Sequence, residues 1–495
     1  MTEPDRLRRY VNDLRRYGYI QSQYFKTKGA IIPIGLSILF LSIVCLMVVG
    51  SQSRFGTDWI IVAIAAVFGG YMALNIGAND VANNMGPAVG GKVLTVLSAV
   101  LIAAVCESAG ALLAGGDVVK TVSKGIISPG EQLNVIEFRY VMLSALLAAA
   151  VWINLATIFS APVSTTHSIV GGVLGGGIAA AGMSLVNWTT MAKIAASWVI
   201  SPVMGAAFAA IFLLFITTRV LNVPDRLEAA RKWVPVLIST MAAVFCAYMA
   251  LKGLKKIWHP TNIEVLAVSV ACFVLTYFLS KPYIEKRTNR LTNTKKDIYS
   301  LFDIPLIGGV ALLSFAHGAN DVANAVGPLA AIVSTIGDGA LIASKVTIPL
   351  WVMAVGAFGI ALGLGLFGPK LITVVGAKIT RLNSPRAYCV ALSAAITVLI
   401  ATTMGIPVSS THIAVGAVFG VGFLREFLEN PNRKKMRSSH LLNRTADEAF
   451  QVPKARKTRR LVRRKFLFGI AAAWVITVPA SGILAGLIYN LVLLV

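Results

Sequence analysis

The sequence predicts an all-α polytopic membrane protein with an inverted internal repeat, broken helices and short hairpin segments. Of its 495 residues, 56% are apolar and only 13% are charged, and the mean hydropathy is +0.76. Apolar runs of about 18 to 25 residues, the length that a helix needs to cross a bilayer, recur along the chain. Two motifs also occur twice, in the same order. A soluble globule could not hide this much apolar surface, so nearly all of the chain is expected to be membrane domain.

The repeat is visible in three landmarks that keep their order in both halves. GANDVANNMGP (77 to 87) matches GANDVANAVGP (318 to 328) at 9 of 11 positions. PVSTTH is followed by PVSSTH at an offset of 245 residues, and IAASW by IAAAW at an offset of 276. Between the second and the third landmark, the second half is 31 residues longer than the first, and a basic loop at about 425 to 465 explains this difference.

The elements follow from this repeat. An apolar helix at 29 to 50 comes first, and each half then contains a helix that runs into the GAND motif, two more helices, a short segment that opens at PVS(T/S)TH, and a last helix. The expected helices are 92 to 116, 139 to 160 and 187 to 217 in the first half, 233 to 251 and 262 to 280 as links, and 345 to 368, 386 to 404 and 466 to 493 in the second half. The total is about 13 membrane segments.

Positive charge predicts the topology, because Lys and Arg are retained on the cytoplasmic side. With a cytoplasmic N-terminus, the inner segments carry 36 of the 45 Lys and Arg residues and the outer segments carry eight. Five crossings per half and two linking helices would insert the second half upside down, an arrangement typical of secondary transporters. The predicted division is 1–57 (basic N-terminus and an additional helix), 58–218 (first repeat), 219–302 (linking loops and two helices) and 303–495 (second repeat, with the cytoplasmic loop 425–465).

The GAND motif places a carboxylate and several carboxamides inside apolar segments. Gly and Pro flank it at a density expected to break the helix, which is tolerated at membrane depth only where the backbone lines a cavity. Oxygen-rich sites suit hard cations, and an intramembrane Asp usually binds an ion, carries a proton or pairs with a base. The alternative is a structural turn that caps a helix. The candidate cation-binding or coupling residues are Asn79, Asp80, Asn83, Asn320, Asp321 and Asn324, with Asp80 and Asp321 as Na⁺ ligands if sodium is the coupling ion.

The PVS(T/S)TH motif places hydroxyl groups after a proline and before a Gly-rich apolar segment. Such hydroxyls are typical N-caps, and the free N–H groups of a helix start bind anions. Two starts from opposed repeats could hold a tetrahedral oxyanion from two sides; ordinary capping of a tight hairpin is the alternative. The candidate anion-binding residues are Ser164, Thr165, Thr166, Ser409, Ser410 and Thr411.

Histidines lie next to both motifs. His167 and His412 close the hydroxyl motifs, where a structural role is favoured over a proton-carrying one. His317 precedes the second GAND motif, whereas Ile76 precedes the first, and for His317 the structural and coupling roles are both open.

Glu107 is a lone carboxylate within an apolar helix, and Gly356 is expected at the matching position of the other half. A buried acid of this kind is a candidate for binding a proton or a cation. The alternative is a simple pairing with Lys92 or with the main chain.

Other classes of function are not favoured. The net charge of +24 is high, but no nucleic-acid module is present, so no nucleic-acid partner is expected. The basic loop 425–465 is explained by topology and by attraction to anionic lipid, with regulatory docking as the alternative. The five cysteines are scattered singly, which supports neither a disulfide framework nor a zinc site. The first apolar run is expected to be retained and not removed as a signal peptide.

The two duplicated motifs resemble those of the inorganic phosphate transporter (PiT) family of cation-coupled symporters, over about residues 58 to 495. The resemblance implies uptake of inorganic phosphate driven by Na⁺ or H⁺, with no further cofactor and no enzymatic activity. It implies that the GAND residues hold cations and that the six hydroxyls surround the anion. It also implies a homodimer in the plasma membrane, here expected to be a bacterial inner membrane.

The chain departs from the family pattern in two places. Relatives often carry a glutamate in the helix before the second PVSSTH motif, where this chain has Ala391, and this leaves the number and identity of the cations open. The helix at 29 to 50 is additional to the usual set and would place the N-terminus inside.

Three other functions compete with phosphate symport. A hydroxyl-lined helix start does not by itself distinguish phosphate from sulfate or another tetrahedral oxyanion. A passive channel would need no coupling ion. An intramembrane hydrolase could use Ser or Thr with His and Asp, but hydrolysis needs one asymmetric triad, whereas these groups occur as matched pairs.

Overall fold

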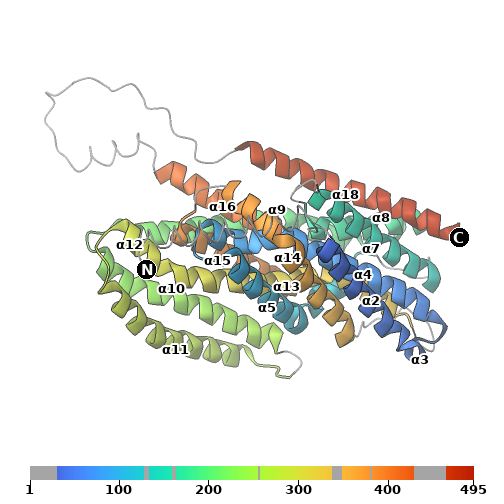
Figure 1. Ribbon diagram of the computed structural model, residues 1–495, viewed down its shortest axis with the longest axis horizontal. Coiled ribbons are helices and arrows are strands. Elements are labelled where there is room, and N and C mark those ends of the chain that lie inside the picture. Colours follow the sequence, from blue (N-terminus) through green and yellow to red (C-terminus); the bar gives the residue numbers. More distant parts are fainter. Residues whose placement is uncertain are drawn as a thin grey trace, which may run out of the picture.

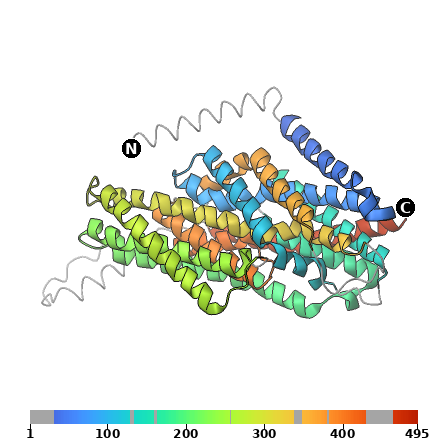
Figure 2. The same cartoon turned by 90° about the horizontal axis from the view of Figure 1, so that it is seen from below.

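The fold is a bundle of long helices (Figures 1 and 2). The computed structural model describes residues 31–127, 133–158, 163–254, 257–336, 348–378, 382–428 and 464–494. Within these ranges there is no strand, only an isolated antiparallel bridge between Ile127 and Val186. Most of the predicted loop 425–465 and the first 30 residues lie outside the described ranges.

The helices match the predicted order. The first half contains α2 (Ile31–Val49), α4 (Trp59–Gly90), α5 (Val96–Ala114), α7 (Val135–Ile158), α8 (Thr165–Ala181) and α9 (Trp188–Ile216). The links are α10 (Arg226–Tyr248) and α11 (Asn262–Thr288), and the second half contains α13 (Asp303–Val333), α14 (Leu350–Lys378), α15 (Ser384–Thr403), α16 (Ser410–Leu428) and α18 (Arg464–Leu493). Twelve of the described helices are long and apolar enough to cross a membrane, one fewer than expected. The difference is α8, which has 17 residues, whereas its counterpart α16 has 19.

The two halves are inverted relative to each other. On α4, Gly69 lies against Ala325 and Leu329 of α13. Further along α4, Asp80 lies against His317 and Asp321. Residue numbers therefore fall along α13 as they rise along α4, and the two helices run antiparallel. This confirms the inverted repeat.

Each half packs its long helix along a helix of the other half. Gly77 of α4 is so close to the carbonyl oxygen of Ile360 on α14 that an added Cβ would lie 2.0 Å from it. Gly318 of α13 has the same relation, also 2.0 Å, to the carbonyl oxygen of Glu107 on α5. In the same way, α8 of the first half packs against α18 of the second half, and α9 packs against α16. The halves are thus interlocked and do not form two separate bodies.

The prediction that the GAND motifs break their helices was wrong. Both α4 and α13 run without interruption through the motif, and Pro87 and Pro328 lie near their C-terminal ends, so little of either helix follows the proline. Gly77 and Gly318 of the motifs serve close helix contact instead of a break. The chain turns elsewhere, between α7 and α8 and between α15 and α16, where each PVS(T/S)TH motif opens the second helix of the pair.

The remaining helices lie at the periphery. The α10–α11 hairpin lies at one edge of the bundle, opposite α18 (Figure 1), and α2 lies on the outside of the bundle (Figure 2). Within the hairpin, the sulfur atoms of Cys246 and Cys272 are 2.7 Å apart, although both cysteines are free thiols. The sequence had shown these two cysteines only as scattered residues.

Candidate functional site

The site lies where the middles of α4 and α13 face each other. Asp80, His317 and Asp321 are buried, and each offers a ligand atom within 4.8 Å of the others. His317 Nε2 is 2.9 Å from Asp321 Oδ2 and 3.7 Å from Asp80 Oδ2. The two aspartates that the repeat predicted as a pair are therefore brought together, with His317 between them.

The hydroxyl groups of the hairpins bind these carboxylates. Thr165 Oγ1 donates to Asp80 Oδ2 at 3.0 Å, and in the other half Ser410 Oγ donates to Asp321 Oδ2 at 2.9 Å. Thr411 Oγ1 adds a bond of 3.0 Å to Asp80 Oδ1 across the two halves. The helix starts of α8 and α16 are thereby fixed on the two aspartates.

Two asparagines hold the hairpin of the opposite half. Asn83 Nδ2 donates to Thr411 Oγ1 at 2.8 Å, and its twin Asn324 Nδ2 donates to Thr166 Oγ1 at 3.1 Å. The two bonds are related by the repeat, because the residues in each pair occupy equal positions in their motifs. We call these two asparagines, the hydroxyl groups that they contact, and the two aspartates the inner ring of the site. The inner ring is therefore built from both halves.

Asn79 and Asn320 lie further out than predicted. Asn79 Nδ2 donates to Thr157 Oγ1 at 3.1 Å, and Asn320 Nδ2 donates to Thr402 Oγ1 at 3.0 Å. Asn320 Oδ1 also accepts from the N–H of Val408 at 3.2 Å. These amides hold the ends of α7 and α15 and the turn before α16, so they position the hairpins. Thr157 and Thr402 were missed, because hydroxyls at helix ends are common in any sequence.

Ser164 and Ser409 cap the hairpin helices. Ser164 Oγ accepts from the N–H of His167 at 3.1 Å, and Ser409 Oγ accepts from that of His412 at 3.3 Å. The predicted N-caps are confirmed at these two serines. The rings of His167 and His412 meet at 4.5 Å between centroids, and the His167 ring also packs on Trp198 at 3.8 Å. The two histidines therefore connect the start of α8 to the start of α16 through their ring contact.

A second polar cluster occurs on one side only. Asn84 Nδ2 donates to Glu107 Oε1 at 2.8 Å, and Glu107 Oε2 is 3.2 Å from His317 Nδ1. Asn84 and Glu107 are almost wholly buried, as is His317. Glu107 therefore pairs with His317 and Asn84, and not with Lys92. Asn84 was missed because its GAND copy has alanine there, which hid it from a search for repeated residues.

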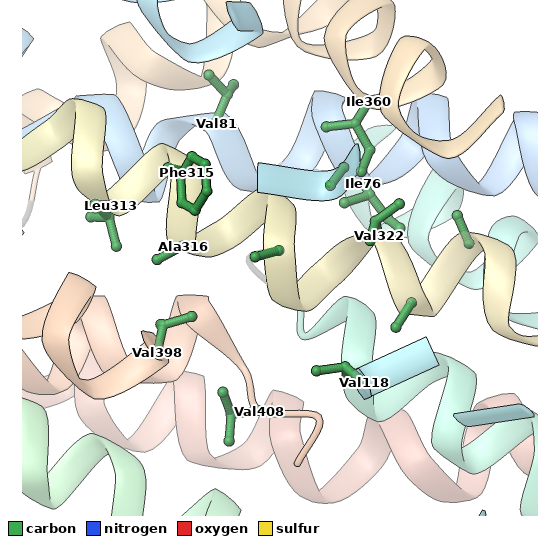
Figure 3. Close-up of a cluster of buried hydrophobic side chains, with 14 of the residues drawn as sticks. Ile76, Val81, Val118, Leu313, Phe315, Ala316, Val322, Ile360, Val398 and Val408 are labelled. Atoms are coloured by element: carbon green, nitrogen blue, oxygen red, sulfur yellow. The ribbon is translucent and has the colours of Figure 1, made fainter. Parts of the chain in front are cut away.

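The counterpart of Glu107 is Ile360, and the expected Gly356 was wrong. The carbonyl oxygen of Glu107 lies over Gly318, and that of Ile360 lies over the equivalent Gly77. The spacing between the GAND motif and the next helix differs between the halves, so counting along the sequence gave the wrong residue. Figure 3 shows Ile76 and Ile360, the apolar counterparts of His317 and Glu107, among the buried hydrophobic side chains.

Comparison with known proteins agrees with this geometry. The family model described as "Phosphate transporter family" matches residues 76–485. The chain belongs to this family. Its members are transporters, so the hydrolase alternative is set aside.

Individual relatives extend over most of the chain. A Helicobacter pylori strain J99 protein, provisionally named a phosphate permease, is 43% identical, and the match covers 92% of this chain and 94% of that protein. The inorganic phosphate transporter 2-1, chloroplastic, of Arabidopsis thaliana is 38% identical over 72% of this chain and 65% of its own. A solved structure titled "The sodium-dependent phosphate transporter" superposes with a TM-score of 0.77 at 35% identity, covering 88% of this chain and 100% of that chain.

Proposed function

We propose that the protein imports inorganic phosphate by symport with Na⁺. One observation carries the proposal: two buried aspartates and the hydroxyl-bearing helix starts of both halves meet in one cluster. The similar structure whose title names a sodium-dependent phosphate transporter supports the choice of sodium. Asp80 and Asp321 would hold the cations. Thr165, Thr166, Ser410 and Thr411, with the N–H groups of the helix starts, would hold the phosphate.

Electrostatics explains why transport would be coupled. A phosphate beside two buried carboxylates is repelled by them, and like charges about 4 Å apart cost on the order of 4 kcal/mol each at an effective dielectric constant of about 20. A cation on the aspartates removes this repulsion, so each ligand raises the affinity for the other. Neither the aspartates nor the hairpins alone would produce coupling.

The inverted repeat gives a route for alternating access. The interlocked long helices would rock around the cluster and open it to one side at a time. We place the N-terminus in the cytoplasm and the protein in a bacterial inner membrane, because Lys and Arg concentrate in the segments that this topology puts inside. Anionic lipid around the basic segments, a homodimer and the domain division 1–57, 58–218, 219–302 and 303–495 belong to the same proposal.

H⁺ is the second candidate coupling ion. The contact of Glu107 with His317 favours it, since two titratable groups lie 3.2 Å apart in the centre of the protein. A sodium-coupled protein would accumulate phosphate with an inward Na⁺ gradient at equal pH. A proton-coupled protein would require an inward H⁺ gradient.

Uptake of labelled phosphate into proteoliposomes tests the proposal. We expect Asp80→Asn and Asp321→Asn each to reduce sodium-driven uptake by at least about tenfold, because a neutral amide attracts a cation far less than a carboxylate does. Asp225→Asn is the matched control, since Asp225 caps α10 away from the site and Asn caps equally well. Wild-type uptake by both aspartate variants would contradict the assignment.

A further inference from the structure

The side-chain oxygen of Asn324 has no part in the contacts described so far. We propose that Asn324 Oδ1 accepts a hydrogen bond from a hydroxyl group of the transported oxyanion, and that the protein thereby selects phosphate and arsenate against sulfate. The inference rests on the proposed transport of phosphate and names the residue that determines its specificity.

The hydroxyl groups beside Asn324 fix the orientation of its amide. Thr166 Oγ1 donates to the carbonyl oxygen of Val408 at 2.9 Å, and Thr165 Oγ1 donates to Asp80 Oδ2 at 3.0 Å. A hydroxyl has a single proton, so both groups can only accept from Asn324. The atom that faces them, at 3.1 and 3.4 Å, is therefore the amide nitrogen. The oxygen is left on the other side of the amide.

This oxygen is buried and accepts no hydrogen bond from any residue in the described ranges. The same is true of Oδ1 of Asp321, one turn earlier on α13. An amide oxygen and a carboxylate oxygen are both acceptors, so each needs a cation or a hydrogen-bond donor as its partner, and burial without one is unfavourable. A carboxylate attracts a cation more strongly than a neutral amide does. Of these two atoms, the Asp321 oxygen is therefore assigned to a cation, and the Asn324 oxygen is left for a donor.

Phosphate is an anion that brings such a donor. Near neutral pH it carries one or two O–H groups, as does arsenate, whereas sulfate carries none. The other groups around the anion are hydroxyls and main-chain N–H groups, and the N–H groups serve any oxyanion equally. A buried acceptor does not serve every oxyanion equally. An anion without an O–H group would place an acceptor oxygen against it, and the two oxygens would repel each other. Sites that hydrogen-bond a substrate O–H reject analogues that lack it by large factors.

The twin of Asn324 in the other half lies in different surroundings. Asn83 donates to Thr411 as Asn324 does to Thr166, but Asn83 is partly exposed, whereas Asn324 has no exposed surface. Water can reach a partly exposed amide and satisfy its oxygen whichever anion is bound. Discrimination against sulfate is therefore expected from Asn324 and not from Asn83.

Competition experiments in proteoliposomes test the inference. In the wild type, arsenate is expected to inhibit labelled phosphate uptake at concentrations similar to phosphate, and sulfate is expected to fail at about a hundredfold excess. Asn324→Leu removes the acceptor at nearly the same volume. We expect it to raise the KM for phosphate about ten- to hundredfold and to reduce the preference for phosphate over sulfate by a similar factor. Asn324→Asp keeps an acceptor oxygen and should retain the rejection of sulfate.

Three controls separate the possible roles. Asn83→Leu removes the twin amide, and we expect lower uptake with unchanged rejection of sulfate. The sodium concentration for half-maximal uptake is measured for every variant, because a cation ligand would shift this value instead of the phosphate-to-sulfate ratio. If Asn324→Leu does not fold, Asn324→Ala replaces it, with binding to purified protein measured by equilibrium dialysis of labelled phosphate against sulfate.

Several results would overturn the inference. The inference fails if sulfate inhibits phosphate uptake by the wild type as strongly as arsenate does. It also fails if the Asn324→Leu protein still rejects sulfate, or if only its sodium dependence changes. A wild type that moves no phosphate under any gradient would instead refute the proposed function, so the two failures can be told apart.

Discussion

The GAND motif on α4 and its copy on α13 share two inner contacts but lie in different surroundings. Asn83 reaches Thr411 as Asn324 reaches Thr166, and Thr165 binds Asp80 as Ser410 binds Asp321. Among the residues around these contacts, the two halves no longer correspond. His317, Glu107 and Asn84 form a polar cluster, and their counterparts are Ile76, Ile360 and Ala325.

The comparison separates two tasks. A tetrahedral anion bridging the halves would be served by matched groups on both sides, such as the Asn83–Thr411 and Asn324–Thr166 pairs. The polar cluster occurs on one side only, so it can interact differently with the two sides of the protein during a coupling cycle. We therefore propose that the duplicated residues serve the anion and its cations, and that the unmatched residues serve the coupling cycle.

The largest expected effect tests the symmetric part. In Gly77→Ala and Gly318→Ala, the new Cβ would lie 2.0 Å from a carbonyl oxygen of the neighbouring helix, which cannot move aside as a side chain can. Both variants should lose about 3 kcal/mol or more of unfolding free energy, by nearly equal amounts. Thermal unfolding of the detergent-purified protein measures this.

Gly86→Ala is the control in the same motif. A Cβ there has no neighbour within 4 Å, so we expect unchanged or slightly increased stability. A large loss of unfolding free energy in only one of the Gly77 and Gly318 variants would show that the two helix contacts differ in rigidity. The two halves would then not be equivalent even at these contacts.

Glu107 tests the asymmetric part. Glu107→Gln keeps the acceptor for Asn84 but replaces the carboxyl group beside His317 by an amide, so the contact between the two titratable groups is lost. We expect sodium-driven phosphate uptake to fall at least about tenfold. Ile360→Leu, a volume-conserving change at the counterpart, should stay within about twofold of the wild type. Equal uptake in Glu107→Gln and wild type would remove the one-sided cluster from the coupling cycle.

The repeat made much of this site predictable. Residues present in both copies, such as Asp80 and Asp321, were found because duplication in an apolar segment is informative. What repetition could not show was contact between unlike residues, as between Asn84 and Glu107. The helix break at the motif was also mispredicted, since glycine density is the same signal for a break and for close packing, and only the neighbouring helix decides between them.

The smallest expected effect concerns the end of α7. Asn154 Nδ2 donates to Asn75 Oδ1 at 3.0 Å, and Asn75 Nδ2 donates to the carbonyl oxygen of Tyr71 at 2.9 Å. The counterparts by motif offset, Leu399 and Ala316, are apolar and buried, whereas Asn154 is partly exposed. Asn154→Leu should lower the unfolding free energy by about 1 kcal/mol, the usual value of one hydrogen bond, and change phosphate uptake by no more than about threefold.

The double variant decides what the pair of asparagines does. Asn154→Leu alone leaves Asn75 Oδ1 without its partner, whereas Asn154→Leu with Asn75→Ala copies the apolar pair of the second half. If the pair only stabilises the end of α7, the double variant should recover most of the lost stability and transport, because removing both partners costs less than removing one. If stability recovers but uptake stays low, the polar pair serves transport, and the difference between the halves extends from the central cluster to the end of α7.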